Sequence, residues 1–307
     1  MSDAGAPAHS SPPIGVIANP PFVRLPDPTV HFRQRAQRFA LLSQGHDLEP
    51  YLRFMAGLAE AQHQCQSDLP EPEMPTAEVR ERARGFAMPP LDRGNFTADQ
   101  ALEVTFDRLF ALAAGIEMPA QARLALEQVS RLDAAGRVAL ADDVLAGATA
   151  ADGLAERVYV AAALQVHVAR LATRLDAKRL VPVGEGACPC CGSAPVSSLV
   201  VDWTGAHNTR FCACWLCATL WHVVRVKCTL CGSTKGITYH EIEAGPGAGL
   251  VRAETCESCG SYAKILLQHA DPALDPVADD VATLGLDLLV RDAGYRRGAV
   301  NPYLVGY

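Results

Sequence analysis

The chain has 307 residues, of which 49% are hydrophobic, and it carries a formal net charge of −7 at pH 7. This hydrophobic content excludes an intrinsically disordered chain and is sufficient for a folded protein of about two domains. The acidic balance argues against a phosphate-binding surface, because such a surface needs an excess of basic side chains.

The sequence predicts a cytoplasmic protein that does not insert into a membrane. Its longest apolar stretch, at 158–169, contains Gln165 and His167 and is shorter than the roughly 18 residues that a membrane-spanning helix needs. The N-terminus lacks the basic and apolar regions of a secretory signal. We expect residues 1–20 to form a flexible tail.

Residues 21–180 show helical periodicity and predict an all-helical domain. The segment HFRQRAQRFALL at 31–42 places its phenylalanines on one stripe, and we expect Arg33, Arg35 and Arg38 to lie mostly away from it. The domain should pack through such apolar stripes.

The remaining helices of this domain follow from caps and prolines. Asp47 is a suitable N-cap for a second helix ending near Gln62, and the prolines of 66–95 indicate a long connection. Further helices are predicted at 97–114, 118–131, 134–147 and 152–178. Residues 181–187 read as a linker.

The pattern changes after this linker. Short β-prone runs occur at 196–203, 220–226 and 237–243, separated by turn-forming glycines. Helical spacing returns within 271–307, the predicted C-terminal helix and tail. One face of that helix should carry Val277, Val281, Leu284 and Leu288, with Gly294 as its C-cap. The sequence thus predicts an α+β protein.

Four Cys-x-x-Cys pairs lie within 188–259, and Cys65 is the one cysteine outside this region. The first and third pairs begin forty residues apart, and the second and fourth begin forty-two apart. Aligning the second pair with the fourth also aligns Arg210 with Arg252 and Leu220 with Tyr262. This self-similarity indicates a duplicated unit, in which two cysteine-bearing turns, or knuckles, form one site.

Cysteines clustered in this way in a reducing compartment predict metal ligands rather than disulfides. Four thiolates favour Zn²⁺ or a mononuclear iron and disfavour Mg²⁺ or Ca²⁺. The predicted ligands of the first ion are Cys188, Cys191, Cys214 and Cys217. Those of the second ion are Cys228, Cys231, Cys256 and Cys259.

Other chemistry-bearing residues lie between these ligands. We interpret Cys190 and Cys212 as small buried residues rather than as exchange ligands or reactive groups. Because eight paired cysteines already fill two sites, His207, His222 and His240 are interpreted as surface groups or as partners of the ligands. The three tryptophans, Trp203, Trp215 and Trp221, are expected to pack around the knuckles.

Six segments, spread over nearly the whole chain, match a known pattern: LPDPTVHFRQRAQRF (25–39), CPCCGSAPVSS (188–198), the R-x3-C-x2-C-x3-W run (210–221), RVKCTLCG (225–232), TCESCGSYAK (255–264) and GYRRGAVNPYL (294–304). In these segments the chain resembles the formate dehydrogenase accessory proteins of the FdhE family. One departure from the pattern is Ala218, which stands where the other three knuckles have glycine, so a wider turn is expected there.

The resemblance implies a helical domain followed by two rubredoxin-like (zinc-ribbon-like) β modules, at 184–226 and 227–270, and a C-terminal helix. It also implies a non-enzymatic factor that binds the catalytic subunit of formate dehydrogenase in the cytoplasm and supports its maturation. The ligand role falls on the eight paired cysteines, with iron favoured over zinc. The oligomeric state does not follow from the sequence.

Two alternatives belong to other functional classes. A zinc-ribbon nucleic-acid-binding protein needs a basic stripe, whereas residues 188–268 contain six basic and five acidic side chains. A thiol–disulfide oxidoreductase needs a thioredoxin-like βαβ context, which the short strands do not provide. No Gly-rich phosphate loop or nucleophile-and-base pair is apparent, and a closed four-cysteine site offers no open catalytic position.

Overall fold

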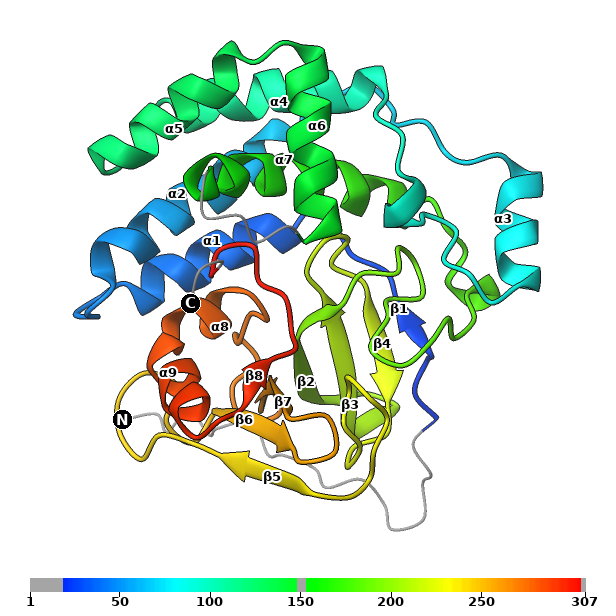
Figure 1. Cartoon of the computed structure of the whole chain (residues 1–307), viewed down its shortest axis with the longest axis vertical. Coiled ribbons are helices and arrows are strands. Elements are labelled where there is room, and N and C mark those ends of the chain that lie inside the picture. The colour runs from blue at the N-terminus through cyan, green and yellow to red at the C-terminus, as the bar shows by residue number, and fades with distance from the viewer. Residues whose placement is uncertain (1–18, 148–152, 305–307) are drawn as a thin grey trace, which may run out of the picture.

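The computed structural model describes residues 19–147 and 153–304. The tail expected at 1–20 therefore lies outside the described residues, apart from its last two. Helices gather in the N-terminal half of the molecule and strands in the following part, with two short helices beside the sheet (Figure 1). This arrangement confirms the predicted α+β class. No helix of the described residues is both long enough and apolar enough to cross a membrane.

Helix α7 (Leu154–Thr173) is the centre of the helical layer, because its side chains are buried around almost its whole circumference. A helix that is apolar on all sides belongs in a core, whereas surface helices bury only one stripe. The helices that surround it are α1 (His31–Leu42), α2 (Glu49–Cys65), α4 (Gln100–Ala113), α5 (Ala120–Arg131) and α6 (Ala134–Ala146).

Polar caps define several helix starts. Asp99 accepts a hydrogen bond from Leu102 N at 2.8 Å at the start of α4, and Asp133 accepts one from Gly136 N at 2.8 Å at the start of α6. The predicted cap Asp47 is wrong. Leu48 occupies the N-cap position of α2, and its amide donates to His46 Nδ1 at 2.9 Å.

The connection predicted at 66–95 contains a helix that the sequence analysis missed. This helix, α3 (Ala77–Gly85), is capped by Thr76, whose hydroxyl accepts from Val79 N, and it buries none of its residues. Because α3 has no apolar stripe against the core, hydrophobic periodicity gave no signal for it.

The strands form one continuous sheet. They are β1 (Val23–Arg24), β2 (Pro195–Trp203), β3 (Ala206–Cys214), β4 (Leu220–Val223), β5 (Ile237–His240), β6 (Val251–Cys256), β7 (Ser261–Leu266) and β8 (Arg296–Arg297). Their order is β1-β4-β3-β2-β7-β6-β5, and β8 pairs with β7. Two of the predicted runs are shorter than expected, since β4 and β5 end before residues 226 and 243.

The duplicated unit is visible in this sheet. Strands β2, β3 and β4 form one antiparallel set, and β5, β6 and β7 form another. The two sets join through parallel pairing of β2 with β7, where Ser198 lies opposite Ile265. The sheet also includes the N-terminal segment, because Val23 pairs with Trp221 of β4.

Two arginines of α1 are buried, contrary to their expected place away from the apolar stripe. Arg35 Nε donates to Asp275 at 3.2 Å, and Arg38 Nη2 contacts Asp279 at 2.7 Å. Burial of these guanidinium groups is tolerated because each is paired with a carboxylate. The stripe residue Phe32 is buried as predicted.

The C-terminal helix is divided into α8 (Ala278–Ala282) and α9 (Leu284–Asp292), which meet at Thr283. The division rotates the second half, so Leu288 is 37% exposed while Val277 and Val281 are buried. Leu284 is still buried as predicted, so the predicted apolar face is wrong only at Leu288. Gly294 follows the C-cap Ala293 with φ +94°, a conformation that favours glycine.

Candidate metal centres

The first cysteine cluster combines two knuckles of the first antiparallel set. Cys188 and Cys191 lie in the turn that precedes β2. Cys214 is the last residue of β3, and Cys217 lies in the turn between β3 and β4. The Sγ atoms of Cys191 and Cys214 are 3.4 Å apart, and those of Cys188 and Cys217 are 3.6 Å apart. The sequence prediction brought together the same four residues that the fold brings together.

The second cluster has the same construction. Cys228 and Cys231 precede β5. Cys256 is the last residue of β6, and Cys259 lies in the turn between β6 and β7. The Sγ separations are 3.9 Å for Cys228 and Cys259 and 3.8 Å for Cys231 and Cys256. Within each cluster all four sulfur atoms lie within 4.8 Å of one another.

These separations fit a tetrahedral metal ion. A metal–sulfur bond of roughly 2.3 Å places tetrahedral sulfur ligands about 3.8 Å apart. The second cluster matches that value, and the first is slightly contracted. Neither cluster includes a histidine or a carboxylate, so the donor set is four thiolates that close the site.

The turn at Ala218 is not wider than the others, contrary to expectation. Ala218 has φ +57°, close to the +74°, +77° and +63° of Gly192, Gly232 and Gly260 at the ends of the other knuckles. The knuckle needs a left-handed residue at this point so that the chain turns back. Ala218 adopts that conformation despite its Cβ, which is unfavourable for an L-residue.

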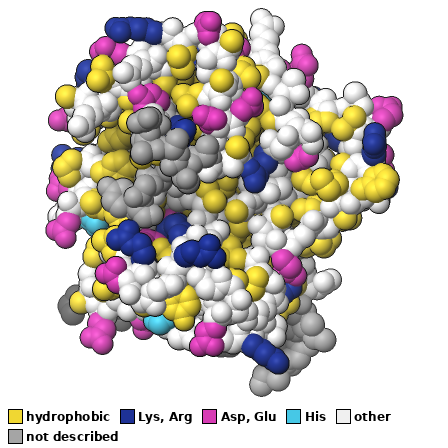
Figure 2. Space-filling view, viewed as in Figure 1, with side chains coloured by type: hydrophobic (Ala, Val, Ile, Leu, Met, Phe, Trp, Pro, Cys, Tyr) yellow, Lys and Arg dark blue, Asp and Glu magenta, His cyan; other side chains and the backbone are white. Residues whose placement is uncertain are grey.

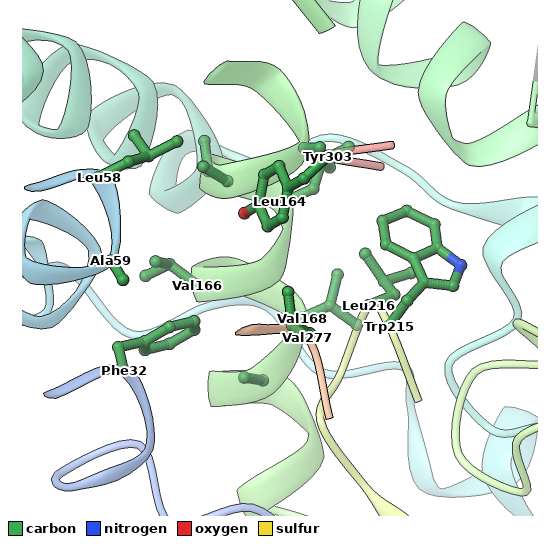
Figure 3. Packing of buried hydrophobic residues seen from close by; sticks show 14 of the residues in the cluster. Phe32, Leu58, Ala59, Leu164, Val166, Val168, Trp215, Leu216, Val277 and Tyr303 are labelled. Carbon is green, nitrogen blue, oxygen red and sulfur yellow. The ribbon is translucent and has the colours of Figure 1, made fainter. Parts of the chain in front are cut away.

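The two clusters differ in their surroundings. All four cysteines of the first cluster belong to the large apolar core that includes α7. Figure 3 shows Trp215 and Leu216, which separate Cys214 from Cys217, on the same side of α7 as Val168. In the second cluster, Cys231 is exposed and Cys259 is partly exposed.

The protein environment alone does not favour four thiolates in the first cluster. Burial raises the pKa of Cys188 and Cys214 well above the ordinary value, whereas hydrogen bonds from neighbouring thiols lower the pKa of Cys217 against the effect of burial. A bound cation would supply the positive charge that keeps the other sulfurs deprotonated.

In the second cluster, one cysteine, Cys256, has a lowered pKa. Burial acts to raise the pKa of Cys256, but hydrogen bonds from the backbone of Cys259 and from neighbouring thiols lower it to about 7. Burial raises the pKa of Cys228 to about 12. The two sulfurs therefore differ in how strongly they depend on a cation.

The spare cysteines are buried, as predicted. Cys190 accepts a hydrogen bond from Thr219 Oγ1 at 3.3 Å, and the same hydroxyl lies 3.2 Å from Cys217 Sγ. Burial raises the pKa of Cys212 to about 12, so this thiol stays protonated. Both residues are packing groups beside the first cluster.

The histidines and tryptophans fill supporting positions. His207 lies 2.6 Å from Asp202 on an exposed hairpin, and His240 contacts Thr255 at 3.1 Å. His222, in β4, is partly buried and packs edge-on against a phenylalanine. Trp215 and Trp221 are buried beside the first knuckles, while Trp203 packs against Arg24. None of the histidines joins a cysteine cluster.

Arg210 joins the two repeat units, a role that the comparison of the two repeats in the sequence did not reveal. It is fully buried and makes a bidentate ion pair with Glu254 of β6, at 2.7 and 3.0 Å. It also donates to the carbonyls of Arg225 and Lys227, just before the third knuckle. Its repeat counterpart Arg252 is instead half exposed and pairs with Glu241.

The fold and the two clusters define an α+β protein with two closed four-cysteine sites suited to metal ions. The chain belongs to the FdhE family. The models of the FdhE N-terminal, central and C-terminal domains match residues 20–185, 187–225 and 226–304.

Individual relatives agree along nearly the whole chain. An FdhE homolog of Rhizobium meliloti is 45% identical over 96% of both chains, and one of Edwardsiella ictaluri is 37% identical over 98% of this chain and 95% of its own. The crystal structure of the FdhE protein from Pseudomonas aeruginosa superposes with a TM-score of 0.84 at 31% identity. That superposition covers 94% of this chain and 99% of the other.

Proposed function

We propose that this protein is a cytoplasmic accessory factor that binds the catalytic subunit of formate dehydrogenase and supports its maturation. The observation that carries the proposal is membership of the FdhE family along the whole chain, together with two intact four-cysteine clusters. The factor acts without catalysing a reaction, because a closed four-cysteine site leaves no coordination position for a substrate.

We further propose that each cluster holds one metal ion, with iron favoured over zinc. The ligands are Cys188, Cys191, Cys214 and Cys217 in the module 184–226 and Cys228, Cys231, Cys256 and Cys259 in the module 227–270. The sulfur separations and the all-thiolate donor set support this assignment. Such an ion supplies charge that stabilises the knuckles and, if it is iron, one-electron chemistry.

Binding of nucleic acid receives no support from the face of the molecule shown in Figure 2. On the face shown in Figure 2, basic and acidic side chains are interspersed rather than segregated into a basic stripe. A protein partner accommodates such a mixed surface, whereas a phosphate backbone requires clustered positive charge.

Two measurements test the proposal. Elemental analysis of protein purified without oxygen should give two metal ions per chain, with thiolate-to-iron absorption if the metal is iron. A tagged chain should co-purify with the catalytic subunit of formate dehydrogenase and restore formate oxidation to cells that lack the factor.

Cys228→Ser should reduce the formate oxidation restored by the factor, and Cys65→Ser, which changes a cysteine outside both clusters, should not. Full maturation by a metal-free variant would contradict the proposal.

A further inference from the structure

The two clusters have the same ligands and the same construction but lie in different environments. In the first cluster, all four cysteines are buried and contribute to the core shared with the helices. In the second, the four cysteines lie outside the two apolar clusters of the described residues. Cys228 and Cys256 are buried, whereas Cys231 is exposed and Cys259 is partly exposed, so a ligand in solution has direct access only to these last two cysteines.

Hydrogen bonds from the helical domain also attach the two knuckles of the first cluster to the core. Leu91 N donates to Cys190 O at 2.9 Å, and Arg93 N donates to Cys191 O at 3.1 Å. On the other knuckle, Gln165 Nε2 of α7 donates to Trp215 O at 2.8 Å. Both knuckles are thus attached to segments outside their own sheet, so opening the first site requires opening the core.

The second cluster has fewer attachments of this kind: Arg296 N of the C-terminal segment donates to Gly260 O at 2.9 Å, whereas the knuckle that carries Cys231 is closed by hydrogen bonds within its own turn. Gly232 N donates to Cys228 O at 3.0 Å, and Gly260 N donates to Cys256 O at 2.9 Å; each of these hydrogen bonds lies within a single knuckle. The two knuckles also meet through an exposed hydrogen bond of 2.9 Å between Ser233 and Ser258. Displacement of Cys231 needs only a local movement of an exposed turn.

We propose that the second site is the one at which metal is exchanged, with Cys231 as the ligand that leaves, whereas the first site retains its metal as part of the core. This inference rests on the proposed ligation of a metal by both clusters. The other three cysteines would keep hold of the ion while a donor atom of the incoming ligand took the place of Cys231. An incoming thiol would release its proton on binding, and the departing Cys231 thiolate would take up one proton from the solvent, so the proton count would not change. The exchange changes no oxidation state. A thiol-bearing ligand or a chelator is the kind of molecule that the site admits.

The test uses the full chain loaded with two equivalents of Zn²⁺, and the probe is the chromophoric chelator 4-(2-pyridylazo)resorcinol. Release should be biphasic, with one equivalent leaving at least about tenfold faster than the other. Quenching the reaction with iodoacetamide after the fast phase should place the label on the peptide containing Cys231, while Cys188 and Cys191 stay unlabelled.

Matched serine variants assign the phases independently. Cys231→Ser should abolish the fast phase and keep one slowly released ion, with unchanged helical circular dichroism. Cys191→Ser, at the equivalent ligand of the first site, should instead lower the melting temperature strongly because its sulfur lies in the core.

Three results would overturn the inference: equal release rates for the two ions, first labelling of Cys188 or Cys191, or a fast phase that persists in Cys231→Ser. These results leave the proposed ligation intact. A chain that binds no zinc at all would refute the ligation itself, and with it this inference.

Discussion

The side-chain amide of Gln165, in the middle of α7, donates a 2.8 Å hydrogen bond to the backbone carbonyl of Trp215 inside a cysteine knuckle. The amide oxygen of the same side chain accepts from Gln62 at 3.0 Å and from Tyr303 at 2.8 Å. One buried glutamine thus connects helices α2 and α7, the cysteine knuckle that contains Trp215, and the C-terminal segment.

This network predicts a large effect for Gln165→Leu, which preserves the size of the side chain but removes its polar atoms. The carbonyl of Trp215 and the hydroxyl of Tyr303 would lose their partner in a buried place, and Gln62 Nε2 would keep only its bond to Ala162 O. We therefore expect a loss of roughly 3 kcal/mol in the free energy of unfolding. Urea denaturation measures it. Gln64→Leu, at an exposed position of α2, is the control and should change stability little; equal losses in both variants would contradict the role of the network.

The buried ion pair between Arg210 and Glu254 predicts a second substitution that strongly lowers the stability of the protein. Arg210→Met leaves a carboxylate buried without its counter-charge, which costs about 3–5 kcal/mol. The double variant Arg210→Met with Glu254→Leu should recover much of this loss, because no unpaired charge remains. Arg252→Met, at the equivalent position of the repeat, should cost less than about 1 kcal/mol because that pair is half exposed. Thermal melting of the four proteins provides the comparison.

The left-handed conformation of Ala218 predicts a stabilising substitution. Ala218→Gly relieves roughly 1–2 kcal/mol of backbone strain and loses about 0.5–1 kcal/mol through the greater freedom of glycine in the unfolded chain. We expect a net gain of about 0.5–1 kcal/mol.

The reverse change at the equivalent knuckle provides the control. Gly260 has φ +63°, and a Cβ there would meet no atom within 4 Å, so Gly260→Ala introduces strain without a clash. It should lower the melting temperature by an amount similar to the rise in Ala218→Gly. Shifts of the same sign in the two variants would show that backbone conformation does not govern the stability of this turn.

His167 predicts a pH dependence of stability. Burial, more than the nearby charges, lowers the pKa of this imidazole to about 4, whereas the unfolded chain has the ordinary value of 6.5. The unfolded state therefore binds a proton that the folded state excludes, and stability is present above pH 6.5 and decreases as the pH falls towards 4. Between pH 7 and pH 5 the loss from this residue is about 2 kcal/mol.

The check is to measure urea denaturation at both pH values in the parent protein and in His167→Gln. The variant should lose about 2 kcal/mol less than the parent over this interval. His207→Gln serves as the control, since His207 lies on an exposed hairpin. An identical pH dependence of parent and His167→Gln would refute the assignment.

The sequence predicted the helical half, the short strands and both cysteine groups because these features depend on local spacing. Helical periodicity located α1 within its observed limits, and the four pairs of cysteines indicated which knuckles combine. Features that depend on distant partners were not predictable. Arg35 looks like a surface residue until Asp275 is placed beside it, and nothing in the repeat distinguishes Arg210 from Arg252 before the two units share a sheet.

The available signal for Gln165 was a polar residue inside an otherwise apolar helix, which indicates a buried partner without naming it. The difference between the two cysteine clusters was also hidden. Equal ligands and equal spacing give no information about which knuckles the helices cover, because that depends on how the sheet packs against α7.

The ion pairs of α1 join residues that are synthesised at very different times. Arg35 and its partner Asp275 are separated by 240 residues, which a ribosome adds over a time on the order of tens of seconds. During that time the first helix has emerged without the carboxylates that neutralise its arginines, and the sheet edge that Val23 completes does not yet exist. The cysteines of the first cluster are synthesised within this interval, while the core that encloses them is still incomplete. In a nascent chain the four sulfurs of the first cluster are therefore accessible to a metal ion before the last segment of the polypeptide encloses them.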